Sequence, residues 1–240
     1  MQGVESRPDI ANRILRALAH DTLERIWPAL ERVELKRGQP IGTVDQRVRR
    51  VYFVERGLIS VVKTMRDGRS IEIGAIGIEG LTDPIVLFGV NGTLLDSVVQ
   101  VPGTAFRGGV EEIRDAMRQD PAMAGLMQRY LRFSFHQLAQ TAACNRLHSL
   151  EERCCRWLLI AHDSAHGDSF PLTHEFLAMM LGVQRAGVTI AANALRNAGL
   201  IAYTHGQITI ANRAGLEEAA CECYRSIEDE LEVVFRPASH

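Results

Sequence analysis

The stretch that decides the fold is residues 172–210, LTHEFLAMMLGVQRAGVTIAANALRNAGLIAYTHGQITI. A helix-turn-helix unit needs two helices that meet at a steep angle, with a small residue at the crossing and a glycine in the turn. Ala178 and Gly182 meet these two needs. Thr173 is a suitable N-cap for the first helix, and Gly199 suits the C-terminal end of the second. The apolar residues expected in the core shared by the two helices are Leu177, Leu181, Val183, Val188 and Ala191.

Two short apolar runs follow the second helix. Residues 200–203 and 207–210 are typical of strands, and Thr204-His205-Gly206 between them is typical of a hairpin turn. A hairpin in this place would form a wing beside the helices. The stretch therefore predicts a winged helix-turn-helix, which is a DNA-binding unit.

The face of the second helix that points away from the core indicates which residues meet DNA. If the helix starts near Gln184, then Val188, Ala192 and Leu195 point inward. Arg185 is the main candidate for base reading, because a guanidinium donates two hydrogen bonds to a guanine edge. The full set of expected DNA-binding residues is Thr173, His174, Gln184, Arg185, Ala186, Thr189, Ile190, Asn193, His205 and Gln207. The open alternatives are a face without base preference and a winged helix used only for protein contacts.

Residues 33–107 are rich in Val, Ile and Gly, which predicts a compact all-β unit. Residues 50–64 and 70–76 are expected to be strands joined by a tight hairpin at Asp67-Gly68. Asn91-Gly92 suggests a second turn of this kind, and Pro102-Gly103-Thr104 suggests another between two further strands.

A long helix is expected to follow the β unit. Helical periodicity starts near Val110, and Asp120-Pro121 predicts an N-cap and first residue of a helix that runs to about Ser149. Its apolar stripe, the expected homodimer interface, comprises Met127, Leu131, Phe135, Leu138 and Ala142. Packing of the stripe on the β unit of the same chain is the alternative. A hinge is expected at residues 147–150, which gives a β unit (1–119), a dimerisation helix with hinge (120–150) and a DNA-binding domain (151–240).

The overall composition adds little to the predictions of function and location. The net charge of −2 gives no sign of nucleic-acid binding. No apolar run is long enough to cross a bilayer, and the charges at Glu5, Arg7 and Asp9 do not fit a secretory signal, so a cytoplasmic location is expected. No nucleotide-binding loop, nucleophile elbow or metalloprotease helix is found, so the chain is not expected to be an enzyme.

Taken together, these features resemble the Crp/Fnr family, the cyclic-AMP receptor proteins and fumarate-nitrate regulators. The most specific part of the resemblance runs from Leu172-Thr173 through Gly182-Val183-Gln184-Arg185 to Val188. It implies an α+β fold with an N-terminal β-roll, like the cyclic-nucleotide-binding jelly roll, a dimerisation helix and a C-terminal winged helix-turn-helix. It also implies a homodimeric transcription regulator that binds double-stranded DNA at an imperfect palindrome, with RNA polymerase a further partner. Ala186 and Ile190 stand where the family commonly has glutamate and arginine, so the familiar operator is not expected.

The resemblance also implies that the N-terminal β-roll senses an effector, but this part of the sequence departs from members of the family that bind cyclic AMP. Where those proteins have a Gly-Glu-Leu loop and an Arg-Ser or Arg-Thr pair, this sequence has Gly80-Leu81-Thr82 and about Leu95-Asp96. No lysine or arginine lies between Arg69 and Arg107 to hold a buried phosphate. The same stretch holds four acids, which are expected to repel a phosphate: Glu72, Glu79, Asp83 and Asp96. Cyclic AMP is therefore not expected as the effector, whose identity stays open.

No cofactor is expected from the cysteines and histidines. The first 143 residues hold no cysteine, which excludes the N-terminal iron–sulfur cluster of some family members. His136 and Cys144 leave haem as a remote alternative. Cys154-Cys155 and Cys221-x-Cys223, with His148 and His162 nearby, contain zinc-ligand types but no C-x-x-C spacing. Buried inert cysteines are expected, with redox-sensing thiols and a metal site as alternatives, so no metal ligand is predicted.

Overall fold

The computed structural model describes residues 10–165, 167–204 and 206–236 of the 240-residue chain. The N-terminal half is a β-roll whose strands pair antiparallel in the order β1-β5-β3-β4, with β2 paired to β5. The strands are β1 (Leu30–Leu35), β2 (Pro40–Gly42), β3 (Arg50–Thr64), β4 (Ser70–Ile76) and β5 (Asp96–Gly109). The predicted bounds of β3 and β4 are confirmed. Short helices flank the roll: α1 (Arg13–Ala17), α2 (His20–Ile26), η1 (Trp27–Ala29) and η2 (Pro84–Phe88).

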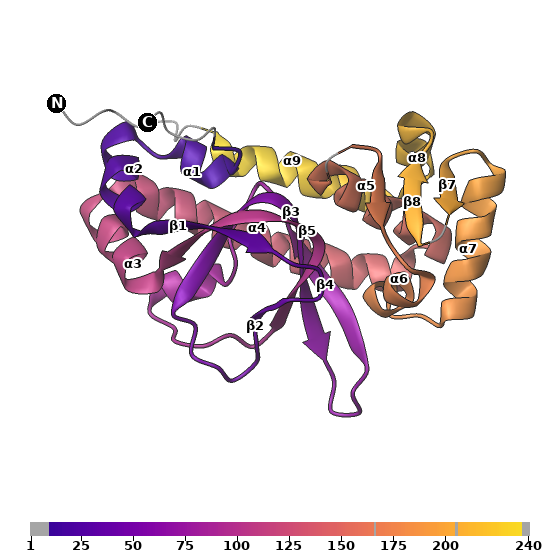
Figure 1. Ribbon diagram of the computed structural model, residues 1–240, viewed down its shortest axis with the longest axis horizontal. Coiled ribbons are helices and arrows are strands. Elements are labelled where there is room, and N and C mark those ends of the chain that lie inside the picture. The colour runs from indigo at the N-terminus through magenta and orange to yellow at the C-terminus, as the bar shows by residue number, and fades with distance from the viewer. Residues whose placement is uncertain (1–9, 166, 205, 237–240) are drawn as a thin grey trace.

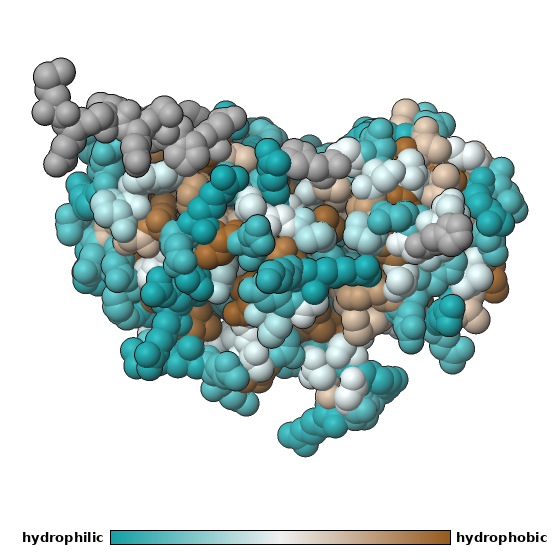
Figure 2. Space-filling model, in the orientation of Figure 1, coloured by the Kyte–Doolittle hydropathy of each residue, from teal (hydrophilic) through white to brown (hydrophobic). Residues whose placement is uncertain are grey.

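The hairpin between β3 and β4 forms as predicted. Gly68 has φ 83°, the positive value that a tight turn needs. The residues of its tip, 65–69, are all exposed. Figure 2 shows this hairpin projecting from the body of the molecule with mostly hydrophilic side chains at its end.

The other two predicted turns are wrong. Pro102-Gly103-Thr104 lies inside β5, which stays paired with β1 and β3 through this segment. The register of β3 against β5 shifts near Arg56, and a Cβ on Gly103 would collide with the Arg56 carbonyl oxygen. The glycine therefore permits a close approach of two strands at a bulge, not a chain reversal. Gly92 makes only an isolated bridge to Arg47, in the segment that leads from η2 to β5.

Two helices follow the β-roll, α3 (Val110–Gln119) and α4 (Pro121–Leu147). The Asp120 side chain accepts hydrogen bonds from the Ala122 and Met123 backbone N–H groups, which confirms the predicted N-cap. In Figure 1 the long helix α4 passes behind the strands of the roll. The side chains of Phe53, Phe106 and Tyr130 share one buried core between the roll and the helices.

Met127 belongs to this core and has no exposed surface. Its predicted place in the dimer interface is therefore wrong, because the β-roll of the same chain already covers it. The stripe on α4 is thus divided: Met127 packs within its own chain, as the alternative had it, and Phe135 and Ala142 are exposed.

The second half of the chain begins after a break at His148 and Ser149, within the predicted hinge. Ser149 caps α5 (Leu150–Ser164) in a reciprocal capping box with Glu152. A small sheet with strand order β6-β8-β7 packs beside the next helices. The elements are β6 (Ser169–Pro171), α6 (His174–Leu181), α7 (Arg185–Asn197), β7 (Ile201–Thr204), β8 (Gln207–Ile210) and α8 (Arg213–Ala219).

The last helix, α9 (Cys223–Phe235), leaves the C-terminal half and returns along α4. Figure 1 shows α9 extending from the region of α5 back over the β-roll half. Ile227 and Val234 are buried in the same core as Met127, and Arg129 of α4 donates a 2.8 Å hydrogen bond to the Val234 carbonyl. The predicted domain 151–240 thus includes a helix that packs with the other half. Within the described residues, no helix is long and apolar enough to cross a membrane.

Candidate DNA-binding interface

The turn between α6 and α7 adopts the geometry that the sequence predicts. Gly182 has φ 64°, and the Val183 backbone N–H donates to the Ala178 carbonyl at 2.9 Å. Val188 of α7 and Leu177 of α6 lie in one buried core with Trp157 of α5. The angle of α7 relative to the rest of the domain is therefore fixed by packing.

The outward face of α7 is exposed. Arg185 lies in its first turn, and Ile190 keeps 67% of its surface exposed although it is apolar. Gln184, Ala186 and Asn193 are also exposed, and Thr189 is half-buried. The residues predicted to point inward, Val188, Ala192 and Leu195, are all buried. The exposed face of α7 is therefore available for contact with a partner.

His174 is held inside the domain, which changes its expected role. Its Nδ1 lies 3.1 Å from the Thr189 hydroxyl, and its Nε2 is buried without a hydrogen-bond partner. Its ring packs 4.6 Å from the ring of Tyr203 in β7. Burial lowers the pKa of His174, and the nearby charge of Arg185 acts in the same direction. The predicted phosphate contact by this side chain stays a prediction; in this geometry Nδ1 lies beside Thr189 and Nε2 is buried, so His174 joins α6, α7 and the wing.

The remaining predicted contacts lie at the edges of this surface. The Thr173 hydroxyl accepts a 3.2 Å hydrogen bond from the Phe176 N–H, which confirms the N-cap, and the residue stays exposed. Gln207 is exposed at the start of β8. His205 lies outside the described residues. Gly199 has φ 71° one residue beyond the C-cap Ala198 and ends α7 as the sequence predicts.

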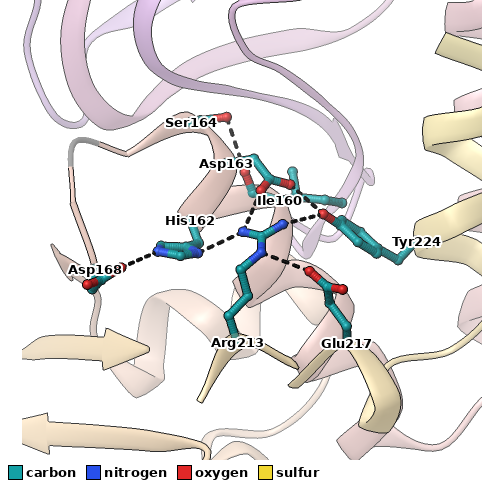
Figure 3. A network of polar contacts seen from close by, with 8 residues as sticks. All are labelled: Ile160, His162, Asp163, Ser164, Asp168, Arg213, Glu217 and Tyr224. Atoms are coloured by element: carbon teal, nitrogen blue, oxygen red, sulfur yellow. Dashed lines mark hydrogen bonds and ion pairs between the residues drawn. The ribbon is translucent and has the colours of Figure 1, made fainter. Parts of the chain in front are cut away.

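A network around Arg213 joins α8 to α5, to α9 and to the segment before β6 (Figure 3). The Arg213 guanidinium donates to Tyr224 Oη, to Glu217 and to His162 Nδ1, each at 2.8 Å, and pairs with Asp163 at 2.7 Å. His162 in turn lies 2.9 Å from Asp168, which directly precedes β6. Sequence reasoning missed this network, because only Glu217 is a local partner, four positions from Arg213, whereas His162 is 51 positions away.

A cavity of about 540 Å³ lies between the β-roll and α4. Most of its lining is apolar, and Asp83 is the one charged side chain among the lining residues, all of which are described. Burial raises the pKa of Asp83, although a hydrogen bond with Thr93 opposes this. The other acids of the segment do not line this cavity, so the expectation that all four would repel a phosphate here was wrong. Asp96, for example, accepts from the Val44 N–H and the Thr64 hydroxyl.

The part of the α4 stripe predicted to form the dimer interface is uncovered beyond Met127. Phe135 is 73% exposed, Ala142 is exposed, and Leu131 and Leu138 are half-buried. Leu131, Phe135 and Leu138 also line the cavity. One apolar surface therefore joins the mouth of the cavity to the exposed side of the long helix.

The cysteines divide into two groups. Cys154 and Cys155 lie in the hydrophobic core of the DNA-binding half, where burial raises their pKa values to about 12 and about 11. Cys144, Cys221 and Cys223 form a separate buried cluster. A hydrogen bond from the Cys221 thiol holds the pKa of Cys144 below its usual range, and the charge of Arg156 acts in the same direction. His162 takes part in the Arg213 network instead.

Comparison with known proteins agrees with this geometry. Residues 152–219 match the family model of the Crp-like helix-turn-helix domain. No curated protein matches the sequence.

Several solved structures share the fold over most of the chain. FixK2 from Bradyrhizobium japonicum has a TM-score of 0.68 at 16% identity, covering 80% of this chain and 98% of FixK2. TTHB099, a CRP-family transcriptional regulator from Thermus thermophilus, has a TM-score of 0.65 at 23% identity, covering 78% and 96%. The c-di-GMP-responsive global regulator CLP from Xanthomonas campestris has a TM-score of 0.64 at 14% identity, covering 81% and 100%.

The fold and the exposed face of α7 define a winged helix-turn-helix protein of the DNA-binding class. More particularly, the chain carries a Crp-like helix-turn-helix domain on the fold of the Crp/Fnr regulators.

Proposed function

We propose that this protein is a homodimeric transcription regulator that reads double-stranded DNA with α7. The observation that carries the proposal is the exposed face of α7, with Arg185 in its first turn and a wing beside it. A helix of this kind enters the major groove with its N-terminal residues at the base edges. Arg185, Gln184, Ala186, Thr189, Ile190 and Asn193 would face the bases, with Thr173 and Gln207 near the phosphates. His174 positions Thr189 and the wing.

The exposed surface of α4 supports the proposed homodimer. The exposed Phe135 and Ala142, with the half-buried Leu131 and Leu138, form an apolar strip on a helix of 27 residues. Pairing of two such strips about a two-fold axis would bury them and place two copies of α7 on one side of a duplex. The operator of such a dimer is an imperfect palindrome. Because a transcription regulator acts at promoters, RNA polymerase would be its second partner. Its place of action would be the cytoplasm.

The cavity beside α4 gives the regulator a place for an effector. Its apolar lining and single acid favour a small, largely apolar molecule without a negative charge. Because Leu131, Phe135 and Leu138 touch both the cavity and the exposed strip, a bound molecule would alter the surface that pairs the subunits. We propose that cyclic AMP is not this effector, since its phosphate would meet no cation there.

Binding to DNA at two salt concentrations tests the proposal. A labelled fragment from the promoter of the protein's own gene would be titrated and followed by fluorescence anisotropy. Release of counterions makes DNA affinity fall about 10³- to 10⁵-fold between roughly 50 and 200 mM salt for a protein with about 6–10 phosphate contacts. The alternative, a winged helix used for protein contacts, predicts no salt-sensitive binding of this fragment.

A further inference from the structure

Four side chains from two separate stretches of the sequence meet where α4, α5 and α9 come together. Cys144 lies in the last turn of α4, His148 is the C-cap of α4, and Cys221 and Cys223 stand at the start of α9. One possible ligand atom from each residue lies within 4.8 Å of each of the others. The Sγ atoms of Cys144 and Cys221 are 3.5 Å apart, and Cys223 Sγ is 3.5 Å from His148 Nδ1.

These distances suit one metal ion in a tetrahedral site. With Zn–S bonds of about 2.3 Å and a Zn–N bond of about 2.0 Å, tetrahedral coordination places sulfur atoms about 3.8 Å apart and sulfur and nitrogen about 3.5 Å apart. A Cys₃His set is one of the common structural zinc sites. The four donors are therefore already near the positions that zinc would require.

The surroundings differ from those of an ordinary buried thiol. Cys154 and Cys155 pack among leucines and Trp157, as small apolar residues do. Cys144, Cys221 and Cys223 instead form a buried cluster that belongs to none of the three hydrophobic cores. Packing in a large apolar core therefore explains the burial of Cys154 and Cys155, but not that of Cys144, Cys221 and Cys223.

Neighbouring polar groups are suited to thiolate ligands. The side-chain amide of Gln140 donates a 3.1 Å hydrogen bond to Cys223 Sγ, the kind of outer contact that orients a metal ligand. A zinc ion with three thiolates and a neutral imidazole carries one net negative charge. Arg153 and Arg156 are buried, with charges that act on the thiols, and the Nε atom of each has no hydrogen-bond partner. These two cations complement an anionic metal centre.

We propose that Cys144, His148, Cys221 and Cys223 bind one zinc ion, which fastens the start of α9 to the end of α4 beside the hinge. The site joins the helix expected to pair the subunits to the helix that returns from the DNA-binding half. Loss of the ion would release α9 from this point and loosen the connection between the two halves. The sequence contained all four ligands, but it did not show that Cys144 joins the Cys221-x-Cys223 pair.

The first measurement is the metal content of the full-length protein, purified without chelators under reducing conditions, by inductively coupled plasma mass spectrometry. The expected result is one zinc per chain. His148→Ala and Cys223→Ser should each lose most of the zinc, whereas Cys155→Ala, which alters a cysteine outside the cluster, should retain it. Full zinc content in both ligand variants would overturn the proposal, as would wild-type protein that contains no zinc and takes up none.

Cobalt titration of the metal-free wild-type chain keeps the test independent of variants that fail to fold. Tetrahedral coordination predicts intense d–d bands and thiolate-to-cobalt charge-transfer bands that saturate at one equivalent and disappear when zinc is added. Iron and sulfide in place of zinc, or a Cys144–Cys221 disulfide in protein kept under reducing conditions, would contradict it. Removal of zinc should also lower the thermal midpoint of the wild type and leave that of His148→Ala unchanged. None of these readouts requires DNA binding.

Discussion

The indole Nε1 of Trp157 in α5 donates a 2.9 Å hydrogen bond to Glu72 Oε1 in β4. Ser60 of β3 donates to the other carboxylate oxygen, and both partners of the indole bond are buried. This contact joins the DNA-binding half of the chain to the β-roll through a carboxyl group that has little access to water. The junction should therefore respond to the ionisation of Glu72.

Glu72 is expected to make stability depend on pH. Burial raises the pKa of Glu72 to about 7, although the hydrogen bond from Ser60, the charge of Arg156 and the hydrogen bond from Trp157 oppose this. Because the folded-state pKa exceeds the unfolded one, the stabilising contribution is complete below the unfolded pKa and is lost as pH rises through about 7. The loss should approach roughly 3 kcal/mol in the free energy of unfolding.

The variant Glu72→Gln isolates this effect from the other titrating groups. Urea unfolding of wild type and variant at about pH 5 and about pH 8 should show the variant gaining stability relative to wild type at the higher pH. An equal difference between the two proteins at both pH values would show that Glu72 does not titrate in this range.

The local parts of the fold could be predicted from the sequence. Asp120-Pro121 and Thr173 mark helix starts because their chemistry satisfies nearby backbone N–H groups, and Gly182 marks a turn because of its positive φ. Pro102-Gly103 has the composition of a turn, but pairing with strands on both sides keeps it extended. Tertiary pairing overrides a local preference there.

Contacts between distant residues could not be predicted. Cys144 and Cys221 are separated by 77 positions, and only the return of α9 along α4 brings them together. Met127 has the spacing of an exposed stripe, yet the β-roll covers it. Periodicity shows that one face of a helix is apolar, but it does not show which partner covers each part of that face.

The Arg213 network should contribute to the stability of the DNA-binding half. Arg213→Ala would leave Asp163, Glu217, Tyr224 and His162 without their shared partner. We expect a loss of about 1–3 kcal/mol in the free energy of unfolding, measured by urea denaturation. Arg225→Ala, an exposed change on α9, should stay within about 0.5 kcal/mol of wild type. If Arg213→Ala and Arg225→Ala lost similar amounts of free energy of unfolding, the network would not make Arg213 more stabilising than an exposed arginine.

Cyclic AMP should not bind tightly to the cavity. A buried cyclic phosphate needs a fixed cation, whereas the lining residues include Asp83 and no lysine or arginine. Isothermal titration calorimetry with the purified protein should detect no sub-micromolar binding. Tight binding would mean that backbone donors or a more distant arginine compensate for the missing cation.

The exposed strip on α4 should control the oligomeric state. Phe135→Glu places a charge at its most exposed aromatic residue and should convert dimers to monomers in size-exclusion light scattering. Gln119→Glu, which adds the same charge at the exposed end of α3, should leave the dimer intact. An unchanged dimer mass for Phe135→Glu would place the subunit interface elsewhere.

Arg185 tests the central claim, that α7 reads base sequence. Binding-site selection from random DNA should yield an imperfect palindrome for the wild type, with half-sites about one helical turn apart. Arg185→Ala should lose about 1–3 kcal/mol per half-site and relax the preference at one symmetry-related base pair. Gln207→Ala on the wing, the matched control, should select the same motif as wild type with uniformly weaker binding if it contacts phosphate. If Arg185→Ala selected the wild-type motif at full strength, Arg185 would not be a base-reading residue.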